Sequence, residues 1–429
     1  MFIFAAMKRI LILLLAMATV SLSAQTVPDN ELSRSIREFP QRAGNNLHSY
    51  EFLPLHDTPA PKGYKPFYIS HYGRHGSRTN GSSDGKSYEK LEKILTNARA
   101  DGQLTADGEL LLSVTRKVIG QFNGMSGRLT ARGCREHASL ADRMYHRYPE
   151  VFKKGSKKIC AVSSTVPRCI VSMAAFTNRL MSIQKDLEIG MDTGEKYMTY
   201  IAQGDTKEIR AMTQPLLDSL HKGMPLDTAA IMATLFKDPA AAREYVHSVK
   251  KFERYVYNVA QATEALDIKE NIYGLLPESV VYRWSESNSM YIYLNHGNSA
   301  EVGDIRVPRA ASLVEDIISR ADEVIAGTPR AADLRFGHDW PFLGLVCYLG
   351  LEGVSDRMTL DEAHGHWLAS LYTPFAANLQ MIFYRNKRQD VLVKFLLNEK
   401  ETLISELAPV QGPYYRWEDV KHHVREEWN

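Results

Sequence analysis

Short apolar runs rich in β-branched and aromatic residues recur along the chain, and each one predicts a β-strand. The first, Pro66-Phe67-Tyr68-Ile69-Ser70-His71-Tyr72, leads directly into a charged turn. The last two follow each other closely and are typical of a pair of neighbouring strands. The runs lie at residues 66–72, 159–164, 334–336, 377–384 and 390–397.

Longer stretches with helical periodicity separate these runs, near residues 86–101, 105–120 and 130–148. Thr130 is a candidate N-cap, and Pro167 is suited to the first turn of the helix that follows the second strand. Strands that alternate with helices predict an α/β fold, with a mostly parallel central sheet and helices on both faces.

The stretch 185–285 has a different pattern, because it is helical throughout and lacks clear buried strands. We interpret it as an inserted α-helical cap domain. The predicted α/β domain is then formed by residues 25–184 and 286–429 together.

The first residues show the order of a secretory signal peptide, which is a charged start, an apolar core and then small residues. Lys8 and Arg9 precede the apolar run 10–20, and residues 21–24 are small or apolar. The alternative is a membrane anchor, but the run is shorter than the roughly 20 apolar residues that span a bilayer. We therefore predict a signal peptide over residues 1–24, a periplasmic or secreted protein, and no membrane attachment after cleavage.

Composition narrows the possible partners. The chain of 429 residues is 44% hydrophobic and 24% charged, as in soluble globular proteins, and its formal net charge is +2. This balance argues against nucleic acid as a partner, so any affinity for anions must come from local clusters of charge. Oligomeric state stays open. The four cysteines fit no zinc pattern, and either free thiols or disulfides are possible for Cys134, Cys160, Cys169 and Cys347.

The charged turn after the first strand is the segment Arg74-His75-Gly76-Ser77-Arg78. Two guanidinium groups flank one imidazole, and arginine presents a planar fork that suits phosphate oxygens. Gly76 allows close approach of the backbone. Taken alone, the segment indicates either an anion site with a candidate nucleophile or a charged surface turn.

Two other strand-to-helix junctions carry matching chemistry. Arg168 follows the second strand, and His338-Asp339 follows the third. An imidazole can donate a hydrogen bond to a phosphate oxygen, and a carboxyl group can protonate a leaving alkoxide, which otherwise departs poorly near neutral pH. Ligands of α/β sheets bind at the carboxyl ends of strands, where these three junctions are predicted to meet.

Together these segments resemble the histidine acid phosphatases, the second branch of the histidine phosphatase superfamily. That family carries an Arg-His-Gly-x-Arg motif near its N-terminus and a His-Asp motif far downstream. The segments 129–148, 163–168 and 373–377 also resemble the family, so the similarity covers most of the mature chain. It implies a small-molecule phosphate monoester as the substrate.

The resemblance implies a role for each site residue. His75 is the nucleophile that becomes a phosphohistidine. Asp339 first protonates the leaving alcohol and then accepts a proton from the attacking water. No metal and no cofactor is required, because arginines supply the positive charge. Four side chains bind the phosphoryl group, namely Arg74, Arg78, Arg168 and His338.

The family includes inositol polyphosphate phosphatases, phytases and broad acid phosphatases. The multiple inositol polyphosphate phosphatases commonly carry His-Ala-Glu where this chain has His338-Asp339-Trp340, whereas many phytases have His-Asp. The polar segment 79–86 either lines the substrate pocket or is a solvated loop. Lys207 and Arg210 are candidates for contacts with additional phosphates.

Two other classes of function are compatible with parts of this pattern. One is a phosphate-ester binding protein of the same fold that has lost catalysis, although the chain keeps both His75 and Asp339. The other is a phosphoryl mutase, which shares the first motif. The export signal and the separate His-Asp segment argue against a mutase. We therefore expect a phosphomonoesterase, with inositol phosphates such as phytate among its candidate substrates.

Overall fold

The computed structural model describes residues 27–202, 207–223 and 229–428. The predicted signal peptide over residues 1–24 lies outside these ranges. Within them, no helix is both long and apolar enough to cross a membrane.

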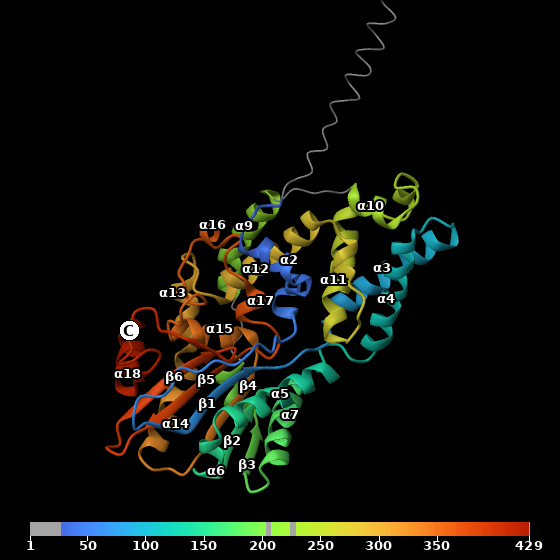
Figure 1. The fold of residues 1–429 in the computed structure, drawn as a ribbon. Helices are drawn as coiled ribbons and strands as arrows, with labels where there is room; N and C mark the ends of the chain where they lie inside the picture. Colours follow the sequence, from blue (N-terminus) through green and yellow to red (C-terminus); the bar gives the residue numbers. More distant parts are fainter. Residues whose placement is uncertain (1–26, 203–206, 224–228, 429) are drawn as a thin grey trace, which may run out of the picture.

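One central sheet organises the chain (Figure 1). Its strands run in the order β3-β2-β4-β1-β5-β6-β7, and β8 pairs with β6. Parallel ladders join β3, β2, β4 and β1, whereas the pairings from β1 onward to β5, β6 and β7 are antiparallel, so the sheet is mixed. The strands are β1 (Lys65–Arg74), β2 (Lys158–Ser163), β3 (Glu188–Thr193), β4 (Ala332–Gly337), β5 (Asn378–Arg385), β6 (Val391–Leu397), β7 (Lys400–Thr402) and β8 (Tyr415–Arg416).

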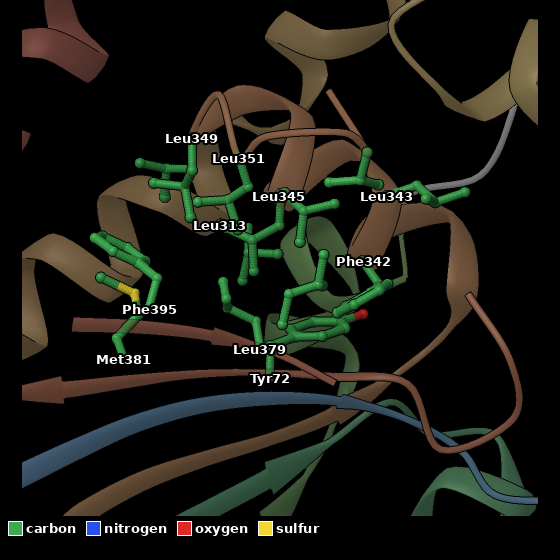
Figure 2. Close-up of a cluster of buried hydrophobic side chains, with 14 of the residues drawn as sticks. Tyr72, Leu313, Phe342, Leu343, Leu345, Leu349, Leu351, Leu379, Met381 and Phe395 are labelled. Carbon is green, nitrogen blue, oxygen red and sulfur yellow. The ribbon is translucent and has the colours of Figure 1, made fainter. Parts of the chain in front are cut away.

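Helices cover both faces of this sheet, as the alternating pattern predicts. Successive side chains of a strand point to opposite faces, and in β1 Tyr68 and Tyr72 enter one buried cluster while Ile69 enters another. The first cluster lies under α14 (Ala311–Ile325) and α15 (Asp339–Tyr348), and Figure 2 shows Tyr72 beside Phe342 in it. The second lies under α5 (Ala131–Arg147) and α7 (Pro167–Ile183). The α/β class is thus confirmed.

The predicted signals for helix starts are also confirmed. The Thr130 hydroxyl accepts a hydrogen bond from the Gly133 amide at 3.3 Å and caps α5. Pro167 occupies the first turn of α7, where a missing N–H leaves no acceptor unpaired.

The helical region differs in two ways from the expected cap over 185–285. First, β3 falls inside that range but pairs with β2 at the edge of the sheet. Its side chains are mostly exposed, so the strand has no apolar run. Second, α3 (Ser82–Ala100) and α4 (Ala106–Phe122), expected in the α/β domain, pack against α11 (Val249–Ala265) in a shared core (Figure 1). The position of the domain boundaries stays a prediction.

The remaining helical elements connect these parts. They are α2 (Glu31–Glu38), η1 (Pro40–Leu47), α6 (Pro149–Lys153), α8 (Glu195–Ile201), α9 (Lys207–Gly223), α10 (Ala230–Leu235), η2 (Ala241–Glu244), η3 (Ile272–Leu275), α12 (Glu278–His296), α13 (Gly303–Arg306), η4 (Val307–Ala310), α16 (Leu360–Ala363), α17 (Ala369–Tyr372) and α18 (Trp417–Glu427). All four cysteines are free thiols in the structure.

The sheet brings together the three strand-to-helix junctions that carry the predicted site residues, at the carboxyl ends of β1, β2 and β4. In the parallel ladders Arg74 of β1 lies opposite Gly337 of β4, and Ser163 of β2 lies opposite Phe336. The strands therefore end side by side, and the segments that follow them begin at the same place. The amide of Ala376, just before β5, donates to the carbonyl of His75 at 3.0 Å and brings a fourth segment to these strand ends.

Candidate active site

A cavity of about 500 Å³ opens at the carboxyl ends of β1, β2 and β4, between the sheet and the helices α3, α11 and α12. His75, Arg78, Arg168, His338 and Asp339 line one part of it. Side chains of the helices α3, α11 and α12, called the helical region below, line the rest. They include Asp84, Arg254, Gln261, Asn288 and Tyr291. The three separate sequence segments thus form one site.

The imidazole of His75 is buried, with 1% of the residue exposed. Its Nδ1 lies 3.0 Å from the carbonyl oxygen of Gly76, to which it donates a hydrogen bond. This contact leaves the proton on Nδ1 and the lone pair on Nε2. Burial, followed by the positive charges of Arg74 and Arg168, holds the pKa of His75 well below its usual range. The imidazole is therefore neutral and can act as a nucleophile.

The loop that carries His75 is fixed by the start of α5. The amide and hydroxyl of Ser77 donate to the two carboxylate oxygens of Glu136, at 2.7 and 2.6 Å. A side chain on Gly76 would place its Cβ 2.6 Å from the carbonyl oxygen of Gly133, closer than atoms can pack. This close approach is why glycine occupies position 76. No motif in the sequence indicates that Glu136 contacts the His75 loop.

Three guanidinium groups surround the imidazole. Arg74 is fully buried, and its Nη1 donates to the carbonyl of Thr373 at 2.8 Å, while its guanidinium lies over the ring of Phe375, 4.8 Å from the centroid. Burial and repulsion by Arg168 and Arg74 lower the pKa of Arg78 to about 10. These charges destabilise one another, and a bound anion would relieve the repulsion.

His338 lies beside Arg168 and close to His75, with the two imidazole centroids 5.7 Å apart. Arg168 Nη2 donates to His338 Nδ1 at 3.3 Å, so Nε2 carries the proton and donates to Ser164 Oγ at 3.0 Å. Burial and the neighbouring Arg168 lower the pKa of His338 to about 4. A phosphoryl oxygen bound by this ring would take the place of one of these partners.

Asp339 begins α15 and has 9% of its surface exposed. Its Oδ2 forms an ion pair with Arg74, whose Nη2 lies 3.0 Å away, and accepts a hydrogen bond from the side-chain amide of Asn46 at 2.9 Å. Burial alone would raise the pKa of Asp339, but the charge of Arg74 and the Asn46 hydrogen bond outweigh it and hold the pKa below its usual range. In this structure Asp339 is therefore a carboxylate.

All six site residues predicted from the sequence meet in the structure, although their chemical roles stay predictions. Of the polar segment 79–86, Asp84 lines the cavity and Lys86 is exposed. The other candidate cations, Lys207 and Arg210, are exposed on α9 and do not line the cavity.

Sequence reasoning missed Asn46 and Arg254, because neither stands in a recognisable motif. Asn46 lies before the first strand, in a segment that contains several prolines. Arg254 lies in a helix whose sequence has an ordinary amphipathic pattern. Among the described residues, no group of three or more His, Cys, Asp or Glu side chains is placed to hold a metal ion.

Comparison with protein families agrees with this geometry. The model of the histidine phosphatase superfamily (branch 2) matches residues 73–398, and the chain belongs to that family. The matched region begins at the end of β1, just before His75, and ends just after β6, so it includes all the strand-to-helix junctions of the site. The resemblance to histidine acid phosphatases is confirmed.

Individual relatives are more distant. Multiple inositol polyphosphate phosphatase 1 of Gallus gallus is 23% identical over an alignment of 309 residues, and the match covers 64% of this chain and 64% of that protein. Multiple inositol polyphosphate phosphatase of Bifidobacterium longum, solved in complex with inositol hexasulfate, superposes with a TM-score of 0.71 at 17% identity, covering 89% of this chain and 97% of that one. The phytase from D. castellii has a TM-score of 0.68 at 11% identity, covering 95% and 88%. These structures share the fold.

We predict that Gly76→Ala reduces turnover about 100-fold, because the added methyl group displaces the His75 loop, and a shift of about 1 Å at a reacting group costs that much. Gly120→Ala in α4 is the matched control, since its Cβ would meet no atom within 4 Å. Phosphate release by the purified variants measures both. Near wild-type activity of Gly76→Ala would contradict the packing described for this loop.

Proposed function

We propose that this protein is an exported phosphomonoesterase that hydrolyses phosphate esters through a phosphohistidine intermediate on His75, with Asp339 as the proton donor. The observation that carries the proposal is a neutral, buried imidazole surrounded by three guanidinium groups, with a carboxyl group at the same cavity. This set of groups combines an anion site, a nucleophile and a proton donor.

In the first step, the lone pair of His75 Nε2 attacks phosphorus in line with the ester oxygen. The N–P bond forms while the P–O bond to the alcohol breaks, and Asp339 transfers its proton to the departing oxygen. The arginines stabilise negative charge on the non-bridging oxygens of the transferring group, as metal ions do in other phosphoryl transfer enzymes.

In the second step, water attacks the phosphohistidine from the side that the alcohol has left. Asp339, now a carboxylate, accepts a proton from this water as the new O–P bond forms. The N–P bond breaks and its electron pair returns to His75 Nε2. Inorganic phosphate leaves, and Asp339 releases its proton to solvent as the charge of Arg74 favours the carboxylate again, so the enzyme is restored.

The ionised state of Asp339 in the structure fits this scheme. Arg74 holds the carboxylate form there. A bound phosphoryl group brings negative charge to the same arginine, which weakens its effect on Asp339 and raises the pKa of the carboxyl group. Protonation of Asp339 then accompanies substrate binding, and we expect an acidic pH optimum.

The rest of the cavity supports a substrate with more than one anionic group. Arg254 of α11 lines it, and its Nη1 donates to Asn288 Oδ1 at 3.3 Å. The guanidinium lies over the ring of Trp284, 4.9 Å from its centroid. Within the described part of the chain, no carboxylate oxygen lies within 4.0 Å of it, so it is available to a ligand.

We propose inositol phosphates such as phytate as substrates. The charge of Arg254 supports this proposal, as do the relatives named as multiple inositol polyphosphate phosphatases and phytases. The proposed location is the periplasm or the exterior, on the basis of the charged, apolar and small-residue order of residues 1–24.

His75→Ala tests the assignment of the nucleophile. Since no other group in the site replaces the imidazole, we expect phosphate release from p-nitrophenyl phosphate, without added metal, to fall below about 0.1% of wild type. Thermal unfolding of the variant checks that it is folded. If a folded variant keeps near wild-type turnover, His75 is not the nucleophile.

Asp339→Asn should slow esters with poor leaving groups much more than p-nitrophenyl phosphate, whose phenolate needs little protonation. Loss of general acid catalysis corresponds to about 10²–10⁴-fold in kcat for an alkyl phosphate such as β-glycerophosphate. Equal losses on both substrates would give Asp339 another role.

Arg254→Ala tests the substrate class. Loss of a hydrogen bond to a charged group is expected to raise KM for phytate about 10-fold or more. KM for p-nitrophenyl phosphate, which has no second anionic group, should stay unchanged. Arg243→Ala, an exposed arginine of η2, is the control. An unchanged KM for phytate in Arg254→Ala would exclude this subsite.

A further inference from the structure

A side-chain amide contacts the acid Asp339, and no motif draws attention to it. Asn46 Nδ2 lies 2.9 Å from Asp339 Oδ2, the same oxygen that Arg74 contacts at 3.0 Å. The main-chain carbonyl of Asn46 accepts a hydrogen bond from Arg74 Nη1. The three residues therefore close a ring of contacts around one oxygen atom. Within the described residues, the other oxygen, Oδ1, makes no hydrogen bond.

The main chain holds Asn46 firmly in place. At Asn45 the backbone of η1 turns with φ at +56°, and the Asn45 side chain donates to the Ala43 carbonyl at 3.0 Å. Just after Asn46, the carbonyl of His48 accepts from the Phe375 amide at 2.8 Å. The Asn46 amide is thus presented to Asp339 by a segment that is fixed on both sides.

The His48 side chain fixes the same segment to the helical region. Its Nδ1 lies 2.9 Å from a carboxylate oxygen of Glu264 in α11, and its Nε2 lies 2.8 Å from Glu51. These carboxylates raise the pKa of His48 to about 9 in spite of its burial. The imidazole therefore stays charged and keeps both contacts across the pH range in which an acid phosphatase works.

The other groups that act on Asp339 are charged or can become charged, and they come from four elements. Arg74 lies at the end of β1 and Arg78 in the loop after it, His296 lies at the end of α12, and His338 precedes α15. In the proposed reaction the two arginines bind the phosphoryl group, whose negative charge offsets theirs. Asn46 is uncharged, so its hydrogen bond to the carboxylate persists when substrate is bound.

We propose that Asn46 is the positioning residue of the proton donor: it fixes Asp339 Oδ2, so that Oδ1 transfers the proton, and it stabilises the carboxylate that remains. This inference rests on the proposed function. It assigns a residue far upstream of the Arg-His-Gly-x-Arg motif to the acid step, through a contact between positions 293 residues apart in the chain.

Removal of the Asn46 side chain should raise the pKa of Asp339, because Asn46 is the donor and the carboxylate is the acceptor. An N–H donor stabilises a carboxylate more than its protonated form, so its removal raises the pKa of the acid. Asn46→Ala should then move the pH at which kcat/KM falls upward by about 1–2 units, from the usual strength of a hydrogen bond to a charged group. A weaker acid is also a poorer proton donor, so kcat falls about 10-fold or more on β-glycerophosphate and little on p-nitrophenyl phosphate.

Asn46→Asp separates this role from a merely structural one. Aspartate has the shape of asparagine, so packing changes less than in Asn46→Ala. It places a second carboxyl group against Asp339, and two carboxyl groups at this distance share a proton. We expect the pH at which kcat/KM falls to shift further in Asn46→Asp than in Asn46→Ala. If damage to packing were the cause, the alanine variant would show the larger change.

The experiment measures pH profiles of kcat and kcat/KM on both esters for wild type, Asn46→Ala, Asn46→Asp and the exposed control Asn97→Ala. Should the alanine variant not fold, the isosteric aspartate variant still tests the shift. Unchanged profiles in the Asn46 variants would overturn the proposal. So would a rise in KM on both esters at constant kcat, which would make Asn46 a substrate contact. If His75→Ala is inactive and Asp339→Asn discriminates between leaving groups as expected, such results refute the role of Asn46 alone and leave the proposed function standing.

Discussion

The structure depends on three guanidinium groups held together around one buried, neutral imidazole. Like charges at this distance repel each other, and burial removes the water that would screen them. The pKa values of Arg78, His75 and His338 are all lowered as a result. The folded protein tolerates this repulsion because carbonyl groups, an aromatic ring and one carboxylate surround Arg74. An anion among these groups would offset their mutual repulsion.

The fold supplies this arrangement by simple means. Parallel strands β1, β2 and β4 end at one edge, so each contributes the residues that follow it. The start of α5 presses against the loop at Gly76, and Glu136 binds the backbone of Ser77. The imidazole is therefore fixed before any substrate arrives. This preorganisation is what lets electrostatic stabilisation act on a transition state without further rearrangement.

Local patterns were sufficient to predict the strands β1, β2, β4, β5 and β6, the starts of two helices and the six residues that meet at the site. Each of these depends on neighbours in the sequence, such as the apolar run of β1 or the cap at Thr130. Contacts between distant segments left no such pattern. Asn46 reaches Asp339 across 293 positions, and Arg254 reaches the cavity from a helix whose periodicity reports only its buried face. Similarly, β3 is an exposed edge strand without an apolar run, so its place in the sheet could not be predicted.

The proposed covalent bond between phosphorus and His75 Nε2 can be tested directly by trapping the phosphohistidine intermediate. The mature protein is mixed with radiolabelled p-nitrophenyl phosphate, quenched in alkali within milliseconds, digested and mapped by mass spectrometry. We expect label on the peptide that contains His75, with the stability in alkali and lability in acid of a phosphohistidine. Full turnover under the same conditions with no labelled peptide, or with label on another residue, would contradict it.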